Sequence, residues 1–146
     1  MTSAGQRFMR RAFLANLAAT AVAGPLGALV QQQLSFEIVA IDLDSLAQWP
    51  LTALVVLVMG QLAGWIAGSP VDAALARLAP RLHWLGVPIS AGLAVAIFAW
   101  TLPWELKEGE LPLLLGLTAA FFGVRRLWLL QSERQGQGAA RVESGT

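Results

Sequence analysis

Four stretches of the chain are almost entirely apolar, and each is about as long as a helix needs to be to cross a bilayer. They cover residues 12–31, 51–68, 85–102 and 111–130, and the only charges within them are Arg125 and Arg126, near the end of the fourth. Four such stretches leave no room for a soluble domain in 146 residues. The pattern predicts an all-α, polytopic membrane protein whose residues 12–130 form a compact bundle of four transmembrane helices.

Polar segments flank and join these stretches. Residues 1–11 form an arginine-rich N-terminal segment, whereas residues 131–146 are rich in Gly, Ser and Gln, a composition that predicts a disordered tail. Residues 32–49 hold acidic and apolar residues in loose alternation, which fits either a strand-like segment or an interfacial helix.

The connection between the second and third stretches has the pattern of a short helix. Ser69 and Pro70 are typical of an N-cap and a first helical position, and Pro80 interrupts the segment that follows. Leu75 and Leu78 recur on one side of it. We expect an amphipathic helix on the inner membrane surface, with a solvated connector as the alternative.

Charged residues are divided unequally between the two sides of the membrane. With the N-terminus in the cytoplasm, Lys107 is the one basic residue of ten that lies outside. By the positive-inside rule, the sequence predicts cytoplasmic N- and C-termini in a multi-pass protein of a bacterial inner membrane. The outer loops then hold most of the acidic residues: Glu37, Asp42, Asp44, Glu105, Glu108 and Glu110.

Composition supports the membrane class. Hydrophobic residues make up 56% of the chain and charged residues 13%, about half the charge that a soluble domain carries. The six tryptophans all fall near the ends of the apolar stretches, where an indole is half hydrated at the membrane interface.

Several kinds of chemistry have no candidate residues. The chain contains no cysteine and a single histidine, His83, which we interpret as an interfacial residue. No nucleophile–base arrangement, phosphate-binding loop or metal-ligand spacing is present, so we expect neither an enzyme nor a metal or cofactor. Because the arginines are dispersed rather than gathered on one basic face, we also expect no nucleic-acid partner.

Small residues recur at four-residue spacing in the apolar stretches, a pattern that lets helix backbones approach closely in a membrane. We interpret these residues mainly as packing surfaces within the bundle, and self-association along the glycine stripe of the second stretch is the alternative. The predicted helix-packing residues are Gly60, Gly64, Gly68, Ala19, Ala23, Gly27, Gly116 and Ala120.

Few polar side chains lie within the apolar stretches. Asn16 and Gln61 both fall in the inner half of the membrane and are expected to hydrogen-bond across helices. The alternative is that Asn16, Thr20 and Gln61 line a polar pathway for water, an ion or a small solute.

Four arginines lie at or near the inner boundary and are candidates for binding lipid headgroups: Arg77, Arg81, Arg125 and Arg126. The last two lie about one turn inside the boundary, and we expect them to extend toward the lipid phosphates.

The N-terminal segment also has the pattern of an export signal. Arg10 and Arg11 precede an apolar run, and a small-residue site ends at Ala23. The uncharged run continues far enough to span the membrane, which favours an uncleaved anchor over cleavage after Ala23.

Small multidrug exporters are similar in length and span count, but they depend on a glutamate in the first helix, and the first stretch here has none. No family is identified from these residues. The leading hypothesis is a non-catalytic accessory subunit of a bacterial inner-membrane complex, with the lipid bilayer and a larger membrane protein as partners. A small oligomeric channel, carrier or holin-like pore built on the Gly60/Gly64/Gly68 stripe is the alternative.

Overall fold

The computed structural model describes residues 4–31, 49–101 and 109–145. These residues are 97% helical and none of them lies in a strand, which confirms the predicted all-α class. The two interpretations of residues 32–49 fall almost wholly outside the described residues.

The helical segments are α1 Ala4–Gln31, α2 Trp49–Ala63, the π-helical turn η2 Gly64–Gly68, α3 Ser69–Leu78, the 3-10 helix η3 Pro80–Leu85, α4 Gly86–Thr101 and α5 Glu110–Ser144. From α2 to α4 the helices follow one another with at most one residue between them. The described residues of each predicted apolar stretch are therefore helical, and α1 and α5 extend well beyond the first and fourth stretches.

The second apolar stretch and the predicted amphipathic helix form one continuous helical path. The prediction of Ser69 as an N-cap is wrong, because its φ of −65° and ψ of −42° are helical. Its hydroxyl donates instead to the carbonyl oxygen of Gly64, at 3.3 Å, within the π-helical turn. The end of this path agrees with expectation, since α3 stops at Leu78, just before Pro80.

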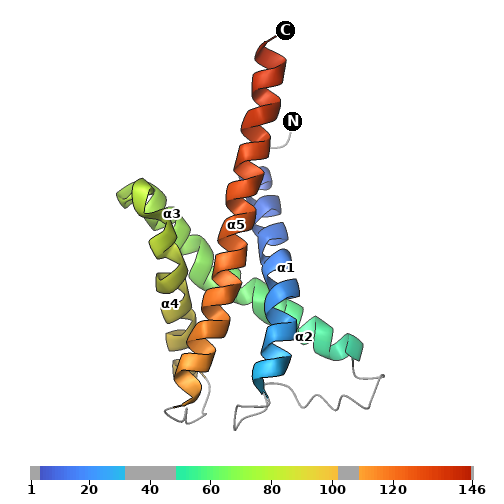
Figure 1. The fold of residues 1–146 in the computed structure, drawn as a ribbon, viewed down its shortest axis with the longest axis vertical. Coiled ribbons are helices and arrows are strands. Elements are labelled where there is room, and N and C mark those ends of the chain that lie inside the picture. The colour runs from blue at the N-terminus through green and yellow to red at the C-terminus, as the bar shows by residue number, and fades with distance from the viewer. Residues whose placement is uncertain (1–3, 32–48, 102–108, 146) are drawn as a thin grey trace.

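The helices are arranged around α5 (Figure 1). The antiparallel helices α1 and α5 pack side by side, and α4 packs against another side of α5. The path from α2 to α3 crosses these helices obliquely, with α2 packed against α1 and η2 against α4. The start of α1 and the end of α5 lie toward the same end of the molecule (Figure 1).

Three helical segments are long and apolar enough to cross a membrane: Ala53–Leu78, Pro80–Thr101 and Glu110–Gly138. This finding is compatible with the predicted membrane class. The first predicted span lies within α1 but is not one of the three, so the count of four spans stays a prediction.

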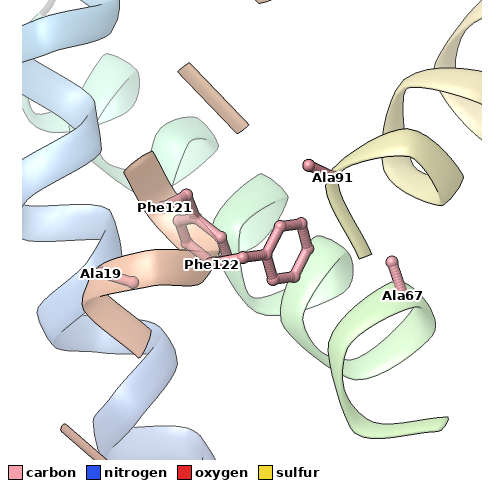
Figure 2. Packing of buried hydrophobic residues seen from close by; sticks show 5 residues of the cluster. All are labelled: Ala19, Ala67, Ala91, Phe121 and Phe122. Carbon is pink, nitrogen blue, oxygen red and sulfur yellow. The ribbon is translucent and has the colours of Figure 1, made fainter. Parts of the chain in front are cut away.

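The apolar core is built where α5 meets its neighbours (Figure 2). Phe121 and Phe122 on α5 are buried and form an edge-to-face pair, with ring centroids 5.1 Å apart. Figure 2 shows this pair between Ala19 of α1 and the alanines Ala67 and Ala91, from η2 and α4. The small alanine side chains leave room for the two rings, so that large residues on one helix fill the space between three others.

The C-terminal segment differs from the predicted disordered tail, because α5 continues to Ser144. Its Gln, Glu, Arg and Ala residues have good helix propensity, and a helix already formed extends at little cost. A Cβ built at Gly136 would lie 3.2 Å from Nη2 of Arg11, which places this extension beside the start of α1.

Candidate functional site

Arg125 lies at the centre of a polar cluster inside the bundle. Its side chain is only 3% exposed. Its Nε donates to Oδ1 of Asn16 at 2.7 Å, its Nη2 donates to Oγ of Ser69 at 3.1 Å, and its Nη1 forms an ion pair with Asp72. One guanidinium thus joins α1, α3 and α5.

The local backbone makes space for this guanidinium. A Cβ built at Gly68 would lie 2.9 Å from Cζ of Arg125, closer than real side-chain contacts allow. Gly68 ends the π-helical turn η2, and the next residue, Ser69, begins α3. The glycine and the π-helical turn therefore bring the α3 backbone close enough for Ser69 and Asp72 to reach Arg125 from one side.

Asp72 also interacts with a second arginine. Nη1 of Arg126 lies 3.5 Å from Oδ1 of Asp72, so the carboxylate is shared by two guanidinium groups. The Asp72 side chain is 18% exposed, and so is that of Arg126. A buried ion pair offsets the cost of desolvation only when further hydrogen bonds satisfy its atoms, as Asn16 and Ser69 do here for Arg125.

The cluster continues from Asn16 toward α2. Nδ2 of Asn16 donates to Oε1 of Gln61 at 3.2 Å, which confirms the predicted hydrogen bond across helices. Gln61 in turn donates from Nε2 to the carbonyl oxygen of Phe13, also at 3.2 Å. Thr20 donates to the backbone carbonyl of Asn16 at 2.8 Å. The three residues considered for a polar pathway are thus bonded to one another or to α1.

The glycine stripe of the second span faces this cluster from within the same chain. A Cβ built at Gly60 would overlap the side chain of Thr20, and one built at Gly64 would overlap that of Asn16. Together with Gly68 against Arg125, these contacts occupy the stripe along its whole length.

The other predicted packing residues differ in how closely they contact a neighbouring helix. Ala19 is fully buried, and Ala23 packs against the same apolar core. A Cβ at Gly27 would lie 3.5 Å from Leu117, in ordinary contact across α1 and α5. Ala120 is half-buried, whereas a Cβ at Gly116 would meet nothing within 4 Å among the described residues.

The four arginines predicted to bind headgroups differ in their exposure. Arg77 and Arg81 are exposed. The expectation that Arg125 extends toward lipid is wrong, because its side chain turns into the bundle, where Asn16 and Asp72 provide acceptors. Arg126 is half-buried, and its Nε is buried without a hydrogen-bond partner among the described residues.

A groove of about 560 Å³ opens beside the cluster, between the start of α1, the segment from α3 to η3, and the second half of α5. Apolar side chains from all three regions line it. The charged residues on its wall are Arg7, Arg11, Arg125, Arg126, Asp72 and Glu133.

Sequence reasoning did not identify Asp72 as a partner of Arg125. The two residues are 53 positions apart, and Asp72 had a sufficient local explanation as an acid in the first turn of a helix. One signal was available: Asp72 is the only acidic residue in the connection from 69 to 84.

Metal binding has no support in the described part of the chain, where no three His, Cys, Asp or Glu side chains are grouped to hold an ion. The groups that the cluster and groove do offer are guanidinium N–H donors, which suit carboxylate or phosphate oxygens. Comparisons with models of protein families, with curated proteins and with solved structures find no match to this chain.

Proposed function

We propose that the protein is a non-catalytic integral membrane protein that acts through helix packing, as an accessory subunit of a bacterial inner-membrane complex. Both termini lie in the cytoplasm in this proposal, and α1 provides the fourth span. The concentration of basic residues in the segments assigned to the inner side supports this orientation.

The cluster around Arg125 carries the proposal. Arg125 is held across three helices, since it uses its donors on Asn16, Ser69 and Asp72. Hydrogen bonds that tie one buried guanidinium to two other helices hold the helices in one arrangement, which suits a scaffold.

The same contacts weigh against the pore alternative. A pore built on the glycine stripe needs Gly60 and Gly64 to face a second copy of the chain. Thr20 and Asn16 of the same chain already occupy the space in front of them. The stripe is therefore used for packing α2 against α1.

An outward stripe on α2 is the surface on which we place the partner helix. Leu54, Val58, Leu62 and Ile66 recur every four residues from α2 into η2, and each is about half exposed. Apolar positions at this spacing form one continuous helix face. Figure 1 shows that α2 runs obliquely, with its start lying away from α5.

Site-specific photo-crosslinking in native membranes tests this proposal. A photoreactive residue replaces Val58 on the outward stripe, and the matched control replaces Leu93, an exposed apolar residue of α4. We expect Val58 to form one adduct of constant mass with a second polypeptide, and Leu93 to form only lipid adducts.

Two other outcomes would overturn the accessory role. Lipid adducts alone at both positions would leave a 15.5 kDa protein without a partner. An adduct of Val58 at twice that mass would favour self-association. Dye leakage from liposomes that contain the wild-type protein would then support the pore alternative.

Cysteine labelling tests the orientation in a chain that has no native cysteine. Gly109→Cys and Gly138→Cys lie at opposite ends of the apolar part of α5, and a Cβ at either position meets nothing within 4 Å among the described residues. A membrane-impermeant maleimide should label Gly109→Cys in intact cells with a permeabilised outer membrane, and Gly138→Cys only in inverted vesicles. The reverse pattern would contradict cytoplasmic termini.

A further inference from the structure

The groove beside the Arg125 cluster has features of a ligand site that helix packing does not require. It measures about 560 Å³ and is bounded by three separate segments of the chain. It adjoins the polar cluster and shares Asp72 and Arg125 with it, whereas Asn16, Ser69 and Gln61 do not line the groove.

The groove carries an excess of positive charge. Four arginines and two carboxylates line it, so the formal excess is two positive charges. Arg125 and Arg126 share Asp72, whereas Arg7 and Arg11 form no ion pair with any described residue. Arg7 and Arg11 are one helical turn apart and so lie on the same side of α1.

Arg126 provides a donor that the protein leaves unsatisfied. Its Nε is buried and has no partner among the described residues, although the side chain belongs to the groove wall. A buried donor without an acceptor is costly, and a charged one is especially so. The guanidinium of Arg126 therefore brings a further positive charge, incompletely hydrogen-bonded within the described residues, to the wall of the groove.

Apolar side chains complete the groove wall. Phe8, Leu75 and Leu129 come from α1, α3 and α5, and they line the groove together with the charged groups. A small hydrophilic anion would make no favourable contact with this apolar surface. A ligand with a phosphate and hydrocarbon next to it matches both kinds of lining.

We infer that this groove binds the phosphate of an anionic phospholipid, with Arg7, Arg11 and Arg126 as the residues that recognise the headgroup. The glycerol and the first part of the acyl chains lie against Phe8, Leu75 and Leu129. The groove lies beside the start of α1 and residues 125–133 of α5, which is the side of the inner-leaflet headgroups in the proposed topology.

Native mass spectrometry of the full chain in detergent micelles tests this inference. The protein is titrated with phosphatidylglycerol, with phosphatidylcholine, which has the same phosphate but no net charge, and with inorganic phosphate. We expect a single phosphatidylglycerol to bind, and phosphatidylcholine and inorganic phosphate to bind much more weakly.

Two pairs of substitutions localise the binding. Arg7→Gln with Arg11→Gln should weaken phosphatidylglycerol binding about 30-fold, from roughly fivefold for each arginine near an anionic phosphate. Both side chains are exposed and lie outside the cluster, so the fold should be retained. The matched control, Arg77→Gln with Arg81→Gln, removes the same charge from exposed positions that do not line the groove. It should weaken binding by less than about threefold, because exposed charges are screened.

Three results would overturn the inference. Equal losses from the two arginine pairs would indicate general attraction to a basic surface. Equal binding of phosphatidylglycerol and phosphatidylcholine would exclude recognition of net charge. Displacement of the lipid by inorganic phosphate at millimolar concentration would assign the groove to a small soluble anion.

Discussion

Removing the charge of Asp72 should destabilise the fold more than any other single charge change in the described part of the chain. Asp72→Asn keeps the shape of the side chain but leaves the guanidinium of Arg125, which is 3% exposed, without its ionic partner. Breaking a buried ion pair from one side costs about 3–5 kcal/mol. Since Asp72 is 18% exposed and Arg125 keeps its bonds to Asn16 and Ser69, we expect a loss of about 3 kcal/mol, at the lower end of that range.

Reversible unfolding in mixed micelles measures this loss. The detergent-solubilised protein is titrated with sodium dodecyl sulfate, and tryptophan fluorescence follows the transition. The matched control is Glu133→Gln, which removes the same charge from an exposed position on α5. The control should change the free energy of unfolding by less than about 0.5 kcal/mol.

A double-mutant cycle separates the pair from the rest of the cluster. Arg125→Met removes the buried cation, so that Asp72→Asn should cost at least about 1.5 kcal/mol less in that background than in the wild type. Additive effects of the two substitutions, or a loss below about 1 kcal/mol for Asp72→Asn alone, would refute the reasoning that Arg125 depends on this carboxylate.

Two further predictions concern the packing of α1 against α2. Gly64→Ala should lower the free energy of unfolding by about 1–3 kcal/mol, because its methyl group overlaps the hydrogen-bonded side chain of Asn16. At Gly116 the added methyl group of Gly116→Ala meets nothing within 4 Å among the described residues. This control should raise the free energy of unfolding by up to about 1 kcal/mol in the same titration. Equal effects of Gly64→Ala and Gly116→Ala on the free energy of unfolding would contradict the packing of Gly64 against Asn16. Gly24→Cys with Val56→Cys should form an intrachain disulfide on mild oxidation, because a Cβ at Gly24 lies 3.5 Å from Cγ1 of Val56, and a gel shift that disappears on reduction would detect it.

The helical architecture was predictable because it depends on the length of apolar runs, which the sequence displays directly. The bond between Asn16 and Gln61 was predictable for a related reason, since amides at similar depth in a membrane have few other partners. The position of Arg125 was not predictable, because the direction of a long side chain depends on which acceptor the fold brings near it. That acceptor, Asp72, lies on another helix, and the local pattern around it was explained without any distant partner.

The continuous helix from α2 to α3 shows the same limit at the level of the backbone. Ser69 and Pro70 have the residue types of a helix start, and local rules cannot distinguish a new helix from the continuation of an existing one. The extension of α5 to Ser144 is similar, since its composition suits both a solvated tail and a helix anchored at one end.

The π-helical turn at Gly64–Gly68 determines the direction in which the side chains of α3 point. A π-helical turn accommodates one residue more than an α-helical turn, and each residue of an α-helix advances the direction of its side chain by about 100°. Without that extra residue, α3 would be rotated by about this angle, and Asp72 would leave the side on which Arg125 lies. A chain shortened by one residue in this turn would have its composition and its apolar runs almost unchanged. Its carboxylate and its guanidinium would nevertheless be out of register, so the ion pair depends on the number of residues in one turn as much as on their identities.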